Sequence, residues 1–125
     1  MPSRRCVLVV DDDPSMRMCI KRMLAEHGFE TTLFDSADAL LVHGDFDGAC
    51  CVVLDINLNG ESGFALRRRL VENGVSLPVI YITGSDSEAS RAAALESGCI
   101  AYLTKPFATK ALIESIALVA RPTIT

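Results

Sequence analysis

The segment "VLVVDDDPSM", residues 7–16, joins a run of four apolar residues to three consecutive aspartates and a Pro-Ser pair. The apolar run is typical of a buried strand. Asp13 followed by Pro14 is typical of a helix start, with Asp at the N-cap and Pro at the first helical position. Asp11 and Asp12 are then left in the turn between strand and helix. Because adjacent carboxylates repel, these two either face water or are held by a cation.

The alternation of apolar runs and segments of helical period occurs five times along the chain. Strands are predicted at residues 6–10, 31–34, 49–54, 78–82 and 100–103. All but the second are nearly continuous apolar runs, as expected for strands covered on both faces. Helices are predicted over about 14–27, 36–42, 63–74 and 87–96, the first with a buried stripe of Met16, Cys19, Ile20, Met23 and Leu24. A last helix is predicted from one apolar face made of Leu112, Ile113, Ile116, Ala117 and Ala120. This order predicts an α/β fold, a doubly wound five-stranded parallel sheet with helices on both faces.

Length and composition fit one globular domain over residues 1–125. The net charge of −4 and the pI of about 5.1 argue against direct nucleic-acid binding, for which a basic surface is usual. Five cysteines, an odd number without a C-x-x-C pair, indicate neither a disulfide framework nor a zinc site. No apolar run reaches the length of a membrane span or resembles a targeting leader, so we expect a cytoplasmic protein without a membrane partner.

Polar residues follow four of the predicted strands. They are Asp11 and Asp12, Asp55, Thr83 and Lys105. Each one alone is typical of a turn or helix cap. In a doubly wound sheet, however, the carboxyl ends of the strands meet at one rim, where the functional site of such folds lies. Three carboxylates there predict a site for a hard divalent cation such as Mg²⁺, next to a hydroxyl and an ammonium group.

Four segments resemble the receiver domain of two-component response regulators, in the same order and over nearly the whole chain. They are "VVDDD" (9–13), "VVLDINLNGESG" (52–63), "YITG" (81–84) and "AYLTKPF" (101–107). The likeness is greatest to receivers of LuxR-type regulators. It implies a flavodoxin-like strand order 2-1-3-4-5. It also implies a protein that takes a phosphoryl group from a sensor histidine kinase or phosphotransfer protein, and that catalyses only its own phosphorylation and dephosphorylation.

The resemblance also implies roles for single residues in the phosphoryl chemistry. Asp55 corresponds to the phosphoacceptor, Asp12 to a direct Mg²⁺ ligand and Asp11 to a ligand through water. The backbone carbonyl of Asn57 corresponds to a further metal ligand. A metal ion and a nearby ammonium group together neutralise the charge of a phosphoryl group in transfer, which agrees with these roles.

Three further residues correspond to positions that contact the phosphoryl group or belong to the family's switch, which is formed by Thr83 and Tyr102. Thr83 would bond the phosphoryl group and Lys105 would pair with one of its oxygens, while Tyr102 would change rotamer. The Lys105-Pro106 bond is expected to be cis. The surface so altered would comprise the fourth helix, fifth strand and fifth helix, roughly residues 87–120, through which we expect a homodimer or a partner to bind.

Two alternatives remain open. A phosphatase of the haloacid dehalogenase type would use Asp11 as nucleophile and Asp13 as general acid, but no acidic pair follows Thr83 and the chain has no room for a cap over the substrate. A degenerate receiver acting only as a binding module would lack phosphorylation, although every position of the receiver set is filled. The Asp55→Asn substitution separates a receiver from a phosphatase, since only the receiver would lose its phosphorylation.

Overall fold

A computed structural model describes residues 5–58 and 60–120 and contains one parallel five-stranded sheet. The strand order is β2-β1-β3-β6-β7, which confirms the predicted flavodoxin-like order. The strands are β1 (Cys6–Val10), β2 (Glu30–Phe34), β3 (Ala49–Asp55), β6 (Val79–Thr83) and β7 (Ala101–Thr104).

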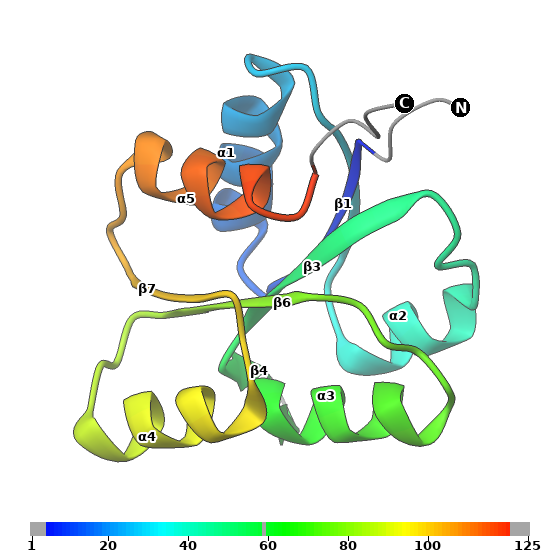
Figure 1. Ribbon diagram of the computed structural model, residues 1–125, viewed down its shortest axis with the longest axis vertical. Helices are drawn as coiled ribbons and strands as arrows, with labels where there is room; N and C mark the ends of the chain where they lie inside the picture. Colours follow the sequence, from blue (N-terminus) through cyan, green and yellow to red (C-terminus); the bar gives the residue numbers. More distant parts are fainter. Residues whose placement is uncertain (1–4, 59, 121–125) are drawn as a thin grey trace.

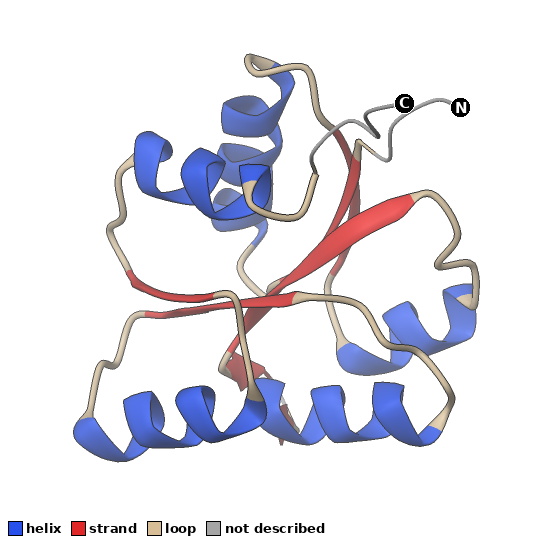
Figure 2. Ribbon diagram, in the orientation of Figure 1, coloured by secondary structure: helices blue, strands red, loops and turns tan. Residues whose placement is uncertain are grey.

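Helices cover both faces of the sheet (Figures 1 and 2). On one face lie α1 (Pro14–Ala25) and α5 (Thr109–Ala117), and on the other lie α2 (Ala37–His43), α3 (Gly63–Glu72) and α4 (Glu88–Ser97). Since side chains alternate along a strand, each strand contributes to both cores. Val7 and Val9 pack in the core under α1 and α5, whereas Leu8 and Val10 pack in the core under α2, α3 and α4. None of the helices in the described ranges has the length and apolar character to cross a bilayer.

The burial of the strands follows the sequence prediction with one exception. Nearly all residues of β1, β3 and β6 are buried, while those of β7 are only half-buried. The reason is that β7 lies at the edge of the sheet, next to β6 alone. The predicted buried stripe of α1 is wrong at Cys19, which is exposed although Ile20 and Leu24 are fully buried.

Two features near the end of β3 were not predicted. A short antiparallel hairpin, β4 (Asn57–Leu58) with β5 (Glu61–Ser62), leads from β3 into α3. Gly63 then begins α3 directly against the backbone of Asp55, where a Cβ atom would lie 2.6 Å from the Asp55 carbonyl oxygen. The hairpin therefore turns the chain back so tightly that only a residue without a side chain fits at this point.

We expect Gly63→Ala to destabilise the protein by about 1–3 kcal/mol, because the added methyl group meets rigid backbone. Urea denaturation measures this loss. Val71→Ala, on the same helix and at a side chain that is 59% exposed, serves as the control and should change stability by no more than about 0.5 kcal/mol. A Gly63→Ala variant as stable as the wild type would contradict the close approach.

Candidate functional site

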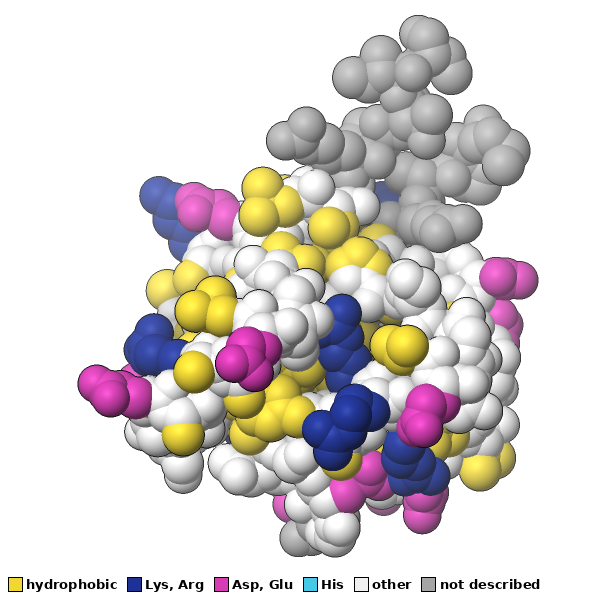
Figure 3. Space-filling view, turned by 60° about the horizontal axis from the view of Figure 1, so that its bottom comes forward, with side chains coloured by type: hydrophobic (Ala, Val, Ile, Leu, Met, Phe, Trp, Pro, Cys, Tyr) yellow, Lys and Arg dark blue, Asp and Glu magenta, His cyan; other side chains and the backbone are white. Residues whose placement is uncertain are grey.

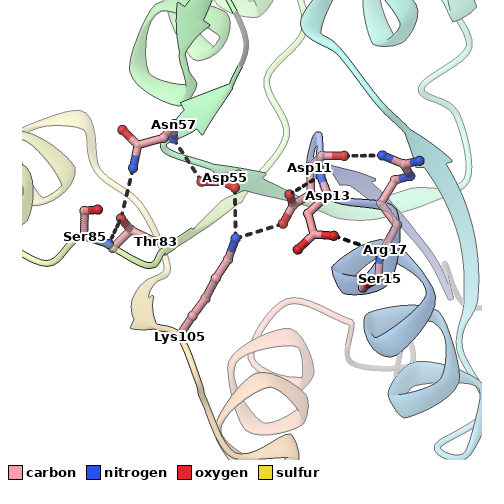
Figure 4. A network of polar contacts seen from close by, with 9 residues as sticks. All are labelled: Asp11, Asp13, Ser15, Arg17, Asp55, Asn57, Thr83, Ser85 and Lys105. Atoms are coloured by element: carbon pink, nitrogen blue, oxygen red, sulfur yellow. Dashed lines mark hydrogen bonds and ion pairs between the residues drawn. The ribbon is translucent and has the colours of Figure 1, made fainter.

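The polar residues predicted at the strand ends lie together at the carboxyl edge of the sheet (Figure 4). Asp11 follows β1 and Lys105 follows β7. Asp55 and Thr83 are the last residues of β3 and β6, because their backbones still pair with the neighbouring strands. Parallel pairing thus places four side chains that are distant in sequence at one rim.

Three carboxylates form an acidic cluster at this rim. Asp11, Asp12 and Asp55 each offer an oxygen, and these oxygens lie within 4.8 Å of one another. Asp11 and Asp55 are buried and Asp12 is half-buried. Oxygen ligands of this charge and spacing suit a hard divalent cation such as Mg²⁺, which is commonly held by one or two carboxylates and by water.

Asp13 does not belong to this cluster. It is the N-cap of α1, where its Oδ1 accepts a hydrogen bond of 2.9 Å from the backbone N–H of Ser15. Pro14 occupies the first helical position, as predicted. The phosphatase alternative would need the Asp13 carboxyl as a general acid, but here it is exposed and already engaged as a helix cap.

Lys105 neutralises part of the acidic charge. Its ammonium nitrogen lies 2.9 Å from Oδ2 of Asp55 and 3.1 Å from Oδ2 of Asp11. Burial by itself would lower the pKa of Lys105, but the hydrogen bonds to Asp55 and Asp11 raise it above its ordinary value. The side chain therefore stays charged at neutral pH. The Lys105-Pro106 bond is cis, as expected.

Asp11 is held in place from several sides. Its Oδ1 accepts the backbone N–H of Asp13 at 2.9 Å, and its carbonyl oxygen accepts a bond of 2.7 Å from the Arg17 guanidinium. Burial raises the pKa of the Asp11 carboxyl above its ordinary value, while the bonds from Asp13 and Lys105 oppose that rise. Arg17 was missed in the sequence, although it lies on the first turn of the helix that follows the aspartates.

Thr83 is fully buried, and its hydroxyl oxygen has two donors in the described residues. The backbone N–H of Ser85 donates to it at 3.0 Å, and the Asn57 side-chain amide donates at 3.4 Å. The backbone N–H of Asn57 donates to Oδ1 of Asp55 at 2.9 Å. Asn57 thus connects the carboxylate at the end of β3 with the hydroxyl at the end of β6.

Tyr102 lies on β7, beside the loop that follows Thr83. Its hydroxyl donates a hydrogen bond of 3.0 Å to Asp86, and the guanidinium of Arg91 lies 5.0 Å from the centre of its ring. Neither Asp86 nor Arg91 was singled out in the sequence. The only signal for this pair is an acidic and a basic residue five positions apart, which is too common to indicate a site.

The geometry suits a reaction in which a carboxylate oxygen acts as the nucleophile. The Asp55 carboxylate sits beside an ammonium group and beside two more carboxylates that can hold a metal ion. Positive charge fixed in this way stabilises the oxygens of a phosphoryl group during its transfer.

Comparisons with known proteins show the family to which the chain belongs. The family model that describes the response regulator receiver domain matches residues 7–117. The RegX3 sensory transduction protein of Mycobacterium tuberculosis is 37% identical over 115 residues, or 92% of this chain and 50% of that protein. Nodulation protein W of Bradyrhizobium diazoefficiens is 32% identical over 114 residues, or 91% of this chain and 50% of that protein.

Solved structures agree in fold. The FixJ-N crystal structure is 28% identical with a TM-score of 0.86, and the match covers 100% of this chain and 99% of that one. The response regulator StyR is 34% identical with a TM-score of 0.84, over 93% of this chain and 59% of that one. The chain spans about half the length of the curated relatives it matches. From the matched family, the order of the strands and the residues gathered at the sheet edge, we conclude that this chain belongs to the receiver domains of response regulators.

Proposed function

We propose that Asp55 accepts a phosphoryl group from a phosphohistidine on a sensor kinase or phosphotransfer protein, with Mg²⁺ as cofactor. The observation that carries the proposal is the position of the Lys105 ammonium group between the carboxylates of Asp55 and Asp11. The histidine kinases that response regulators typically work with supply such a donor. They act inside the cell, so the proposal places this chain in the cytoplasm.

In the proposed reaction an Asp55 oxygen attacks phosphorus, the O–P bond forms, and the N–P bond of the donor breaks with the electron pair passing to nitrogen. Mg²⁺ would supply positive charge to the phosphoryl oxygens and would be held by Asp11, Asp12, Asp55 and the Asn57 carbonyl. Lys105 supplies a second positive charge from the protein. Beyond forming and losing its own acyl phosphate, the chain needs no further catalytic activity.

Asp55→Asn should abolish phosphorylation by acetyl phosphate, because an amide oxygen is a poor nucleophile. The wild type should gain one phosphoryl group in the presence of Mg²⁺ and lose it in hydroxylamine, as an acyl phosphate does. Intact-protein mass spectrometry measures both, with Asp45→Asn, at an exposed aspartate, as the matched control. A phosphoryl group gained by Asp55→Asn would contradict the assignment, and none gained by the wild type would favour the binding module.

Asp12→Ala should weaken Mg²⁺ binding at least about tenfold, which corresponds to roughly 1.4 kcal/mol. The reason is that the half-buried Asp12 carboxylate would be a direct ligand of the ion. Isothermal titration calorimetry measures the affinity, with Asp45→Ala as control. Equal affinities of Asp12→Ala and the wild type would place the metal elsewhere.

The proposal includes a switch of the surface formed by α4, β7 and α5. A phosphoryl group on Asp55 offers Thr83 a charge-assisted hydrogen bond, which would draw the loop after β6 toward the site. The α4 helix follows this loop and exposes Leu95, whose side chain is 77% exposed. Figure 3 shows hydrophobic side chains gathered between charged ones on the face to which α3 and α4 belong. We propose that a second copy or a partner binds through α4, β7 and α5.

Thr83→Ala should still be phosphorylated but should not change its association, since the acceptor remains and the hydroxyl that senses it is lost. Sedimentation velocity with and without beryllofluoride, a mimic of the phosphoryl group, measures association. Thr31→Ala, on β2 at the opposite edge of the sheet, should behave as the wild type. The switch is refuted if Thr83→Ala responds to beryllofluoride as the wild type does.

A further inference from the structure

Three side chains on the surface beside the site form one cluster, which we call the Asp86 clamp: Asp86, Arg91 and Tyr102. Arg91 donates two hydrogen bonds to Asp86, from Nε to Oδ1 and from the terminal nitrogen to Oδ2, each 2.9 Å long. Tyr102 donates its hydroxyl to Oδ1 of the same carboxylate at 3.0 Å. The Arg91 guanidinium also lies over the Tyr102 ring, 5.0 Å from its centre. Each member of the clamp therefore contacts the other two.

The contacts of the clamp are of the stronger kinds available on a surface. A two-pronged arginine–carboxylate pair has a defined geometry that a single ion pair lacks. The hydrogen bonds that Arg91 and Tyr102 donate lower the pKa of Asp86, so its carboxylate remains an acceptor at neutral pH. Arg91 stands in the first turn of α4, where the helix dipole disfavours a cation, and Asp86 offsets this cost.

The clamp connects the loop after β6 with strand β7, the two segments that would change in the proposed switch. Asp86 belongs to the loop that follows Thr83, and the Ser85 N–H bonds this loop to the Thr83 hydroxyl. Tyr102 belongs to the neighbouring strand β7. A displacement of Thr83 toward a phosphoryl group on Asp55 would draw Asp86 along with the loop. It would thereby stretch the contacts that hold the tyrosine.

We propose that the Asp86 clamp holds Tyr102 in the arrangement seen here and so opposes the switch that phosphorylation of Asp55 drives. This inference rests on the proposed function and identifies the contacts that oppose the proposed switch. Arg91 and Asp86 are positioning residues that act through Tyr102. Because a ligand and a conformational restraint are coupled reciprocally, loosening the clamp should both release the tyrosine and tighten the binding of a phosphoryl mimic.

Arg91→Ala is the direct test, read by fluorine NMR of protein labelled with 3-fluorotyrosine. The chain has two tyrosines. Tyr81 is fully buried against Phe64 and serves as an internal reference, and Tyr102→Phe assigns the remaining signal. Without any phosphoryl mimic, Arg91→Ala should move the Tyr102 signal toward its position in beryllofluoride-saturated wild type. The Tyr81 signal should not move.

The second readout is the beryllofluoride concentration that gives half saturation in the presence of Mg²⁺. It should fall about fivefold in Arg91→Ala, which corresponds to losing an exposed ion pair and a cation–π contact. Arg91→Lys keeps the charge without the two-pronged bond and should lie between Arg91→Ala and the wild type. Arg68→Ala, at an exposed arginine of α3, is the matched control and should change neither readout.

The outcomes separate the clamp from the function on which it rests. An unmoved Tyr102 signal, or an unchanged half-saturating concentration in Arg91→Ala, would overturn the clamp while leaving Asp55 as acceptor. An Arg91→Lys variant equal to the wild type would show that charge alone acts, and would also overturn it. Absence of saturable beryllofluoride binding in the wild type would overturn the proposed function, and the regulatory role of the clamp with it.

Discussion

The contact between Lys105 and two buried carboxylates is the constraint on which the rest of the site depends. Three aspartates are held within a few ångströms of one another, and like charges at such distances are costly unless a cation balances them. The protein supplies one cation of its own, the Lys105 ammonium group, at the loop that follows the edge strand β7. The remaining negative charge favours the binding of a metal ion at the same place. This imbalance of charge suits the site to a divalent cation, which the proposed phosphoryl transfer requires.

The sheet and the loops around it fix this arrangement. Gly63 lets the chain return against the backbone of Asp55, and Arg17 bonds the carbonyl of Asp11. The loop after Thr83 is tied differently, through the Ser85 N–H and the side chains of the Asp86 clamp at the surface. Surface contacts of this kind contribute far less than buried packing, which suits a segment that would move in the proposed switch. The acidic side of the site is thus held by more buried contacts than the loop after Thr83.

The sequence was most informative where a residue's role depends on its own strand. Continuous apolar runs predicted β1, β3 and β6, and the parallel order then brought Asp11, Asp55, Thr83 and Lys105 together as expected. It was less informative where contacts depend on tertiary geometry. The β4–β5 hairpin has only two residues in each strand, too few for a periodic pattern, and Cys19 matched the apolar spacing of α1 but lies outside its buried face. To predict the pairing of Asp86 with Arg91 and Tyr102, one would have to know the relative positions of a loop, a helix and a strand.

We propose that Lys105 and a divalent cation both neutralise the acidic cluster, in which the ammonium group contacts Asp11 and Asp55. The most direct measurement is the Mg²⁺ affinity of Lys105→Met, compared by calorimetry with the wild type and with Lys110→Met, whose side chain is 85% exposed in the wild type. We expect Lys105→Met to bind Mg²⁺ several-fold more tightly, because the competing positive charge is gone, and Lys110→Met to bind it as the wild type does. Equal or weaker Mg²⁺ binding by Lys105→Met would contradict it.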